Sequence, residues 1–300
     1  MRKEKLRVVS LCSGIGAQER GFEESGCFDV EVVGTSEIDI NAIISYAAIH
    51  CGLTDEMVEN YQFYPSMAEM RYYLKDKNIG YSPEKDKEYN WFKSGKAFER
   101  KVKTTWLACM LNKNLGDVSL VDILPEADVW FLSFPCQSLS ISGKLAGMAE
   151  GSGTRSSLVW ETIRLLRKAK ETHTLPKYMM LENVKNLVGK QFIQDFNRLN
   201  EIIEQEFGYN VQWKVLNACN CGVPQNRERV FCIYIRKDID KSNYEFPLPF
   251  DNGIRLKDVL EDDVDESYYV QTEKSEQLIA GLIDEGRLDL EKYITEMERI

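Results

Sequence analysis

The sequence VVSLCSGIGA occupies residues 8–17 and decides the fold. Its apolar start predicts a short buried strand over Val8–Leu11, because a brief apolar run bounded by turn residues is typical of a sheet interior. Gly14 and Gly16 follow, and glycine permits tight turns and a close approach of the backbone to a ligand. A helix-like stretch then runs to near Gly26. The segment therefore predicts a strand, a glycine turn and a helix.

A second strand and an acid complete this unit. Val30–Thr35 predicts a strand closed by Glu37 and Asp39, and Asn41–Ile49 predicts the next helix. This order is typical of a βαβ unit, in which an acid after the second strand can hold a ribose diol. The turn and Glu37 favour an adenosine-type cofactor over a purely structural turn. The full dinucleotide pattern is absent, because Glu19 stands three residues after the second glycine.

Regular alternation of strands and helices returns after residue 128. Helices are expected at 158–170 and 192–207, and the second of these stops at Gly208. The expected strands are Val129–Ser133, Tyr178–Leu181, Val211–Leu216 and Val230–Ile235. The pattern predicts an α/β fold with a mostly parallel sheet and helices on both faces.

Residues 51–113 interrupt this alternation. The segment mixes basic with aromatic side chains: Tyr89, Trp91, Phe92, Lys93, Lys96, Phe98, Arg100, Lys101, Lys103 and Trp106. Two interpretations stand, an amphipathic surface insertion and a contact with nucleic acid. The first is favoured by about two to one.

Composition limits the class of protein. The 300 residues carry a formal net charge of -10, so an anionic partner has to meet a local basic patch. Eight cysteines form no CxxC pair and only two histidines are present, so no metal site is expected. The apolar run near the start is too short for a signal peptide, and no window could span a membrane. The sequence predicts a cytoplasmic protein with no membrane partner.

A thiol lies just beyond the expected third strand, in FPCQSLSISGK (134–144). Ligand sites of open α/β sheets lie at the carboxyl ends of strands, and Pro135 restricts the backbone beside Cys136. By spacing alone, Cys136 fits a buried core thiol and a nucleophile equally well. The long Ser- and Gly-rich stretch that follows favours a binding loop or lid.

Two further polar groups are ambiguous when taken alone. Glu182 follows the strand at 178–181 and could cap the next segment or act as a protonated carboxyl that donates a proton. Arg227 and Arg229 precede the last strand and suit an anionic substrate or surface salt bridges.

Taken in order, these pieces resemble the cytosine-5 DNA methyltransferase family. The matching stretches are LCSGIGA (11–17), SEID (36–39), GDV (116–118), FPCQSLSISGK (134–144), LENVKN (181–186) and GVPQNRERV (222–230). The resemblance implies a Rossmann-like sheet that binds S-adenosyl-methionine and acts on a cytosine flipped out of double-stranded DNA.

The resemblance also implies a role for individual residues. Cys136 is the expected nucleophile, Glu182 contacts N3 of cytosine and Arg229 contacts the base. The resemblance places Glu37 at the ribose and Asp117 at the adenine amino group of the cofactor. The expected cofactor contacts are Leu11, Gly14, Gly16, Glu37, Ile38, Asp117, Val118, Pro135 and Leu158. The expected DNA contacts are Gln137, Ser140, Ser142, Lys144, Gln225 and Arg227.

The sequence departs from the family pattern in three places. Cys12 replaces the usual aromatic residue, and residues 51–113 are longer than the usual link. Neither a target-recognition domain nor the last cofactor motif is found in residues 240–300. We therefore expect a catalytic domain at 1–255 and a linker or incomplete recognition region at 256–300. The alternatives are a fragment that binds cofactor but needs a missing region or partner chain, and a tRNA cytosine-5 methyltransferase.

Overall fold

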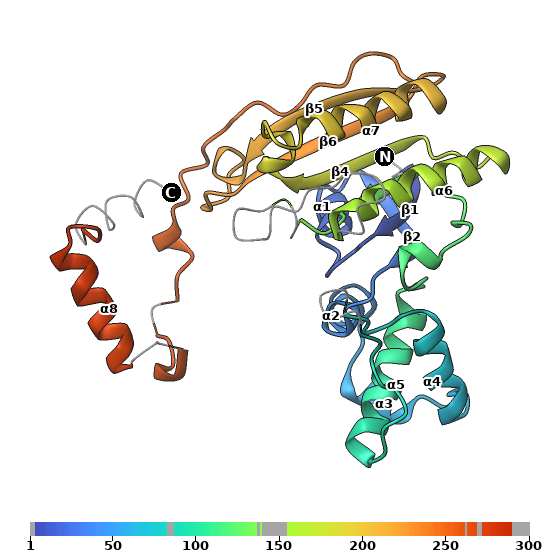
Figure 1. Cartoon of the computed structure of the whole chain (residues 1–300), viewed down its shortest axis with the longest axis horizontal. Coiled ribbons are helices and arrows are strands. Elements are labelled where there is room, and N and C mark those ends of the chain that lie inside the picture. Colours follow the sequence, from blue (N-terminus) through green and yellow to red (C-terminus); the bar gives the residue numbers. More distant parts are fainter. Residues whose placement is uncertain are drawn as a thin grey trace. The chain divides into compact units, whose positions relative to one another are not determined.

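The fold is a six-stranded α/β sheet, seen in a computed structural model that describes residues 4–82, 87–136, 139, 155–261, 263–268 and 272–289 (Figure 1). The strands are β1 (Glu4–Leu11), β2 (Phe28–Ser36), β3 (Val129–Leu132), β4 (Tyr178–Val184), β5 (Tyr209–Asn217) and β6 (Glu228–Arg236). Their order is β2-β1-β3-β4-β6-β5, and the pairs β1–β2, β1–β3 and β3–β4 are parallel. The predicted α/β class and mostly parallel sheet are confirmed.

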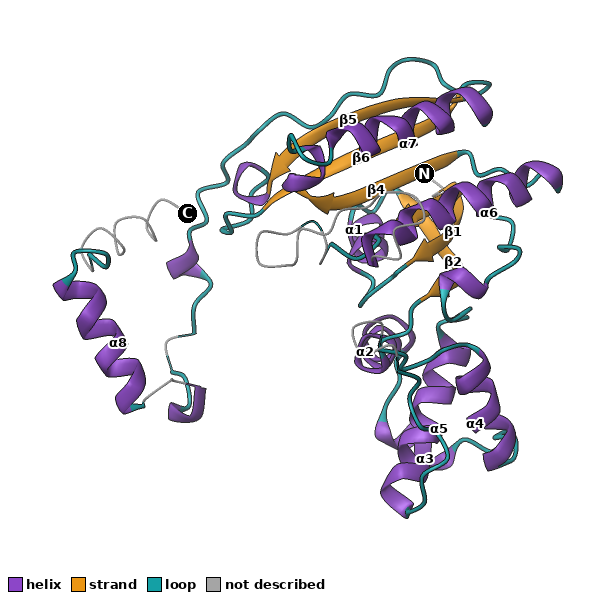
Figure 2. Cartoon of the chain, viewed as in Figure 1, coloured by secondary structure: helices purple, strands orange, loops and turns teal. Residues whose placement is uncertain are grey.

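Helices alternate with these strands as the apolar spacing predicts (Figure 2). They are α1 (Ala17–Glu24), α2 (Ile40–Cys51), α6 (Val159–Glu171) and α7 (Ile193–Glu206). Phe22 of α1 packs on a core cluster formed by Leu6, Val8, Val129 and Phe131 of β1 and β3. Because β1 is buried on both faces, its apolar residues run consecutively rather than alternating with polar ones.

Asp128 connects three strands of the sheet: it directly precedes β3, and it binds Arg7 of β1 and Lys177, which directly precedes β4. Its carboxylate accepts from the Arg7 backbone N–H at 3.0 Å and pairs with Lys177 Nζ at 2.8 Å. Partial burial alone would raise the pKa of Asp128, but the Lys177 ammonium and the Arg7 N–H outweigh it and lower the pKa. The ionised carboxylate therefore contributes to stability at neutral pH.

The long segment between β2 and β3 folds into helices α3 (Asp55–Asn60), α4 (Met67–Asp76) and α5 (Lys96–Leu111). We call residues 51–113 the helical insertion. Its apolar residues, among them Met70, Leu74 and Trp91, form one core cluster with Ile40 and Ile43 of α2. Trp91 is 1% exposed, and its indole N–H donates to the Ile79 carbonyl at 2.8 Å. The insertion is thus a packed helical layer and not an extended loop.

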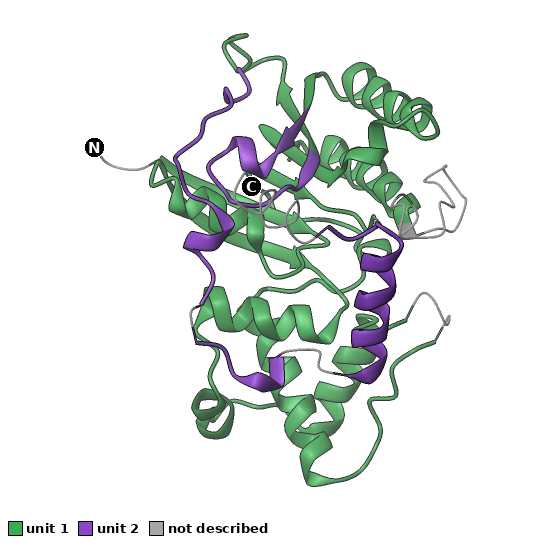
Figure 3. Ribbon diagram, turned by 90° about the vertical axis from the view of Figure 1, so that its left-hand side faces the viewer, with its two compact units in different colours: residues 1–214, 230–244 green, residues 215–229, 245–300 purple. Residues whose placement is uncertain are grey.

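Clustering of contacts divides the chain into two compact units that interleave in sequence (Figure 3). Unit 1 comprises residues 1–214 and 230–244, and unit 2 comprises 215–229 and 245–300. Unit 2 contains helix α8 (Glu273–Asp284). The expected functional boundary at residue 255 stays a prediction. Among the described residues, no helix is both long enough and apolar enough to cross a membrane.

Candidate active site

The glycine turn after β1 has a backbone that few other residues could adopt. Cys12, Gly14 and Gly16 all have positive φ, at 54°, 55° and 81°. The turn closes with a hydrogen bond from the Gly16 N–H to the Ser13 carbonyl at 3.0 Å. A Cβ on Gly14 would meet nothing within 4 Å. The backbone at Gly14 is therefore open to a ligand, as expected for a cofactor contact.

Glu37 ties this turn to the end of β2. Its Oε2 accepts from the Gly14 N–H at 2.9 Å, and its Oε1 accepts from the N–H groups of Ile38 and Asp39 at 2.8 and 2.9 Å. A carboxylate offers about four lone pairs. With three engaged by these backbone groups, one is left for a hydroxyl such as that of a ribose.

Three side chains support the turn from behind. His50 Nε2 lies 3.0 Å from the Ile15 carbonyl, and its ring packs on Tyr46 with centroids 4.5 Å apart. The Tyr46 hydroxyl donates to Glu19 Oε1 at 3.3 Å. Glu19 is 1% exposed, and burial raises the pKa of its carboxyl against opposing hydrogen bonds. Sequence reasoning missed this cluster and treated Glu19 only as a break in the dinucleotide pattern.

A shallow hollow lies at the carboxyl ends of β1 and β3. Leu11, Val118 and Leu158, three of the expected cofactor contacts, line it together with Cys12 and Phe134. The hollow encloses only about 10 Å³, room for about one water molecule, so a nucleoside would lie over it.

The residues at this edge fit an adenosine-type cofactor. The hollow supplies apolar walls, Gly14 an open backbone and Glu37 a carboxylate. Gln18 Oε1 is buried with no hydrogen-bond partner within the described part of the chain, although its Nε2 donates to Ser133 Oγ. A buried acceptor without a partner is costly, so a donor on a bound ligand would stabilise it.

The Cys136 thiol is half-buried, four residues beyond the end of β3. Three side chains bind backbone carbonyls on either side of it. Asn183 Nδ2 donates to Phe134 O at 2.9 Å, Ser156 Oγ to Pro135 O at 2.7 Å and Asn186 Nδ2 to Leu139 O at 2.6 Å. These contacts fix the backbone that carries the thiol. Cys136 is therefore not a fully buried core thiol, unlike Cys109 and Cys232.

Glu182 lies within β4 and not after it. The strand was expected to end at Leu181, but it continues to Val184. Asn183 is 3% exposed and its side chain bonds to the Phe134 carbonyl, so a buried polar residue continues the strand instead of ending it. Through Asn183 and Asn186, the segment that carries Glu182 is joined directly to the Cys136 segment. Asn183 and Asn186 were quoted within LENVKN, yet their positioning role was not anticipated.

The arginine segment, which carries Arg227 and Arg229, belongs to unit 2. Asn217 shapes it, because its Oδ1 accepts from the Arg227 N–H at 2.9 Å and its Nδ2 donates to Asn226 Oδ1 at 2.8 Å. Gln225 and Arg227 are exposed and Arg229 is half-buried. The two expected DNA contacts in this segment can therefore reach an external partner.

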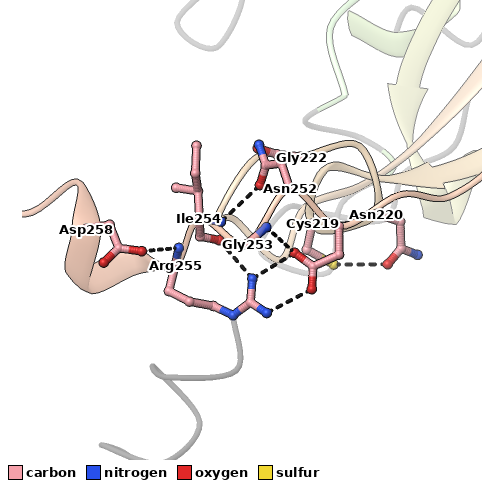
Figure 4. A network of polar contacts seen from close by, with 9 residues as sticks. Cys219, Asn220, Gly222, Asn252, Gly253, Ile254, Arg255 and Asp258 are labelled. Atoms are coloured by element: carbon pink, nitrogen blue, oxygen red, sulfur yellow. Dashed lines mark hydrogen bonds and ion pairs between the residues drawn. The ribbon is translucent and has the colours of Figure 1, made fainter.

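A larger hollow of about 370 Å³ lies in unit 2. Figure 4 shows the network of polar contacts formed mainly by residues that line it. Arg255 forms a two-pronged pair with Asp251 at 2.8 Å, and Asn252 Nδ2 donates to the Gly222 carbonyl at 2.8 Å. The Arg255 charge is balanced by Asp251 inside the network and is not available to bind an anion. The contact between Asn252 and Gly222 supports the loop that leads to the arginine segment.

Four expected DNA contacts, Gln137, Ser140, Ser142 and Lys144, lie outside the described residues. In the helical insertion Trp91 and Trp106 are buried and cannot stack on bases, whereas Phe92, Lys93 and Lys96 are exposed. Lys93 Nζ lies over the rings of Tyr89 and Phe98, at 5.7 and 5.9 Å. Lys101 and Lys103 lie over the rings of Tyr89 and Tyr64, at 4.8 and 5.2 Å. A contact of this segment with nucleic acid stays a prediction.

Comparison with known proteins gives one family. The sequence profile of C-5 cytosine-specific DNA methylases matches residues 90–287. The type II methyltransferase M2.ScrFI of Lactococcus lactis subsp. cremoris is 38% identical over 270 residues, 89% of this chain and 70% of the relative. The orphan methyltransferase M.SssI of Spiroplasma monobiae is 35% identical over 239 residues, 77% of this chain and 60% of the relative. The chain thus spans between about 60% and 70% of these proteins.

A solved structure supports the fold alone. The methyltransferase EhMeth of Entamoeba histolytica superposes with a TM-score of 0.53 over 90% of this chain and 64% of its own, at 15% sequence identity.

Proposed function

Because the chain belongs to the C-5 cytosine-specific DNA methylase family, we propose that it methylates carbon 5 of cytosine in double-stranded DNA with S-adenosyl-methionine. The observation that carries the proposal is the shared edge of the sheet. The open glycine turn with Glu37 and the fixed Cys136 segment both lie at the carboxyl ends of β1, β2 and β3. A cofactor and a nucleophile are needed at one place, and the candidate residues for both lie at this edge, which supports the proposal.

The reaction needs a nucleophile because C5 of cytosine is weakly nucleophilic in the aromatic ring. The thiolate of Cys136 adds to C6 and breaks the C5=C6 double bond, which places electron density on C5. Bound S-adenosyl-methionine would supply an electrophilic methyl group for C5. A base then takes the C5 proton, and the C6–sulfur bond breaks to restore the double bond and the thiolate.

The remaining site residues act on the charge of the ring. Glu182 donates a proton or a hydrogen bond to N3, and Arg229 donates to O2, so both stabilise the negative charge that develops during thiolate addition. A stacked base hides C6 from a thiol, so the cytosine has to leave the duplex. Asn183, Ser156 and Asn186 keep the thiol segment in place before the base arrives.

A second candidate follows from the length of the chain relative to its relatives. A chain spanning 60% of M.SssI and 70% of M2.ScrFI could bind the cofactor and yet lack the part that delivers the base. Cofactor binding without methyl transfer is the behaviour expected of that candidate.

The deciding experiment incubates the 300-residue chain with labelled S-adenosyl-methionine and mixed-sequence DNA. Cys136→Ser is the test variant, and Cys27→Ser, which changes an exposed thiol, is the matched control. We expect label on DNA for the unmodified chain and the control, and none for Cys136→Ser. Equal transfer by Cys136→Ser would refute the assigned nucleophile.

Two further arms separate the alternatives. Transfer of label to tRNA but not to DNA would favour the alternative of a tRNA cytosine-5 methyltransferase. Cofactor binding with no transfer to either nucleic acid would favour the second candidate.

A further inference from the structure

The helical insertion contacts the edge of the sheet where the adenosine part of the cofactor is expected. The Gly80 N–H donates to the Ile38 carbonyl at 2.7 Å, and the Asp117 N–H donates to the Lys77 carbonyl at 3.0 Å. Ile38 and Asp117 are both expected cofactor contacts. The turn at residues 77–80 therefore contacts both the segment at Ile38 and the segment at Asp117, each about forty residues away in the sequence.

The approach at this turn is close. Gly116 has a φ of 86°, and a Cβ there would lie 2.4 Å from the Lys77 carbonyl oxygen. Such a contact admits only glycine. The backbone preceding Asp117 is thus shaped around the insertion.

Within this turn, Asn78 reaches the carboxylate of Asp117. Its Nδ2 donates to Asp117 Oδ2 at 3.0 Å. The amide orientation follows from charge, because the opposite orientation would place the amide oxygen against a carboxylate oxygen. Asn78 has a φ of 55°, and asparagine is among the few non-glycine residues that adopt this left-handed region readily.

The two oxygens of Asp117 have different partners. Oδ1 accepts from the Ser119 N–H at 3.0 Å and from Ser119 Oγ at 2.8 Å, which uses both of its lone pairs. Within the described part of the chain, Oδ2 accepts only from Asn78. One lone pair of Oδ2 is left, and its direction is set by the other.

We propose that Asn78 is a positioning residue that holds Asp117 so that the free lone pair of Oδ2 accepts from the 6-amino group of adenine in the cofactor. This inference rests on the proposed function, since it assumes that Asp117 meets the adenine. It assigns to the helical insertion a part in cofactor recognition that the family motifs do not contain.

The test measures binding of S-adenosyl-homocysteine and of its hypoxanthine analogue, S-inosyl-homocysteine, by titration calorimetry. The analogue carries a 6-oxo group in place of the 6-amino donor, so a fixed carboxylate repels it. The variant is Asn78→Gly, which keeps the left-handed backbone and removes the amide. Asn90→Gly is the matched control, because the exposed Asn90 side chain accepts from the nearby Phe92 N–H and has no other hydrogen bond within the described residues.

For the unmodified chain and the control we expect a clear preference for the adenine ligand. Asn78→Gly should bind that ligand about 5- to 10-fold more weakly, as for the loss of a typical hydrogen bond, and the preference should shrink by a similar factor. Asn78→Asp, which puts a second carboxylate against Asp117, should reduce the preference further. It serves if the glycine variant is too unstable to titrate.

Three results would overturn the inference. Equal weakening for both ligands would leave the preference unchanged and would mean that Asn78 is merely structural. If the unmodified chain bound neither ligand, the cofactor assignment itself would fail, and this inference with it. Binding by the unmodified chain with no change in Asn78→Gly would remove the inference alone and leave the proposed function standing.

Discussion

Replacing Gly16 by alanine tests how the cofactor turn is held. The new methyl group would lie 2.3 Å from His50 Nε2 and 2.7 Å from Tyr46 Cε2. Tyr46 is 2% exposed and has no room to move. His50 could move only by giving up its contact with the Ile15 carbonyl. The φ of 81° at Gly16 adds backbone strain for any residue with a side chain.

The cost can be estimated from these contacts. A left-handed alanine costs about 1–2 kcal/mol, the lost hydrogen bond about 1 kcal/mol and the overpacking about 1–3 kcal/mol. Together they amount to roughly 3–6 kcal/mol, a large part of the 5–15 kcal/mol that typically separates folded from unfolded states. Gly16→Ala should therefore unfold at much lower urea concentration than the unmodified chain.

Gly14→Ala is the matched control, because it has the same chemistry in the same turn. Its φ is 55°, but its methyl group would meet nothing within 4 Å. We expect a loss of only about 1–2 kcal/mol in the free energy of unfolding, from backbone strain alone. The protruding methyl group should instead weaken binding of S-adenosyl-homocysteine, because it occupies the open face of the turn.

The assay is urea denaturation of both variants followed by circular dichroism, with calorimetric titration of the ligand. Equal free energies of unfolding for Gly16→Ala and Gly14→Ala would show that the support by His50 and Tyr46 is not real. Unchanged ligand binding by Gly14→Ala would show that the open face of the turn is not where the ligand lies.

Two other predictions concern charge. Changing Lys93 and Lys96 to glutamine should weaken binding to mixed-sequence DNA in a gel-shift titration. The slope of log binding constant against log salt concentration should fall in magnitude by about 2, roughly 0.9 per lost phosphate contact. Unchanged binding would mean that these lysines of the helical insertion do not contact DNA. Asp128→Asn should lower the free energy of unfolding by about 1 kcal/mol at pH 7, because folding lowers the pKa of the Asp128 carboxyl. The carboxylate stabilises the fold above the ordinary aspartate pKa of about 3.9, and this stabilisation is lost as pH falls through the pKa of the folded state. A stability difference between the two proteins that persisted at pH 2 would contradict that linkage.

The parts of the fold that periodic patterns determine could be predicted from the sequence. The strand at 129–133 and the helix at 192–207 were expected within two residues of β3 and α7. The glycine turn was also expected, because only glycine tolerates that backbone without cost. These features depend on neighbours in the chain, so they leave a local pattern.

The contacts between distant segments could not be predicted. Asn78 and Asn183 are single asparagines whose partners lie 39 and 49 residues away. No spacing announces such a bond, because it depends on how the whole chain folds. The burial of Trp91 and Trp106 could not be predicted either, because the basic and aromatic mixture at 89–106 does not show which rings face inward. A contact of this segment with nucleic acid stays a prediction.

The interleaved makeup of unit 2 has a consequence for how proteins of this kind can exchange parts. Phe250 covers Gly222, where a Cβ would lie 2.7 Å from its ring, and the Phe250 N–H donates to the Asn220 carbonyl at 2.9 Å. Residues 245–255 thus brace the loop that leads to Gln225 and Arg229. A recombination event at the apparent border near Tyr244 would remove that brace from the segment that we propose contacts the base. Viable chimaeras in this region should therefore have their crossover points beyond Asp258.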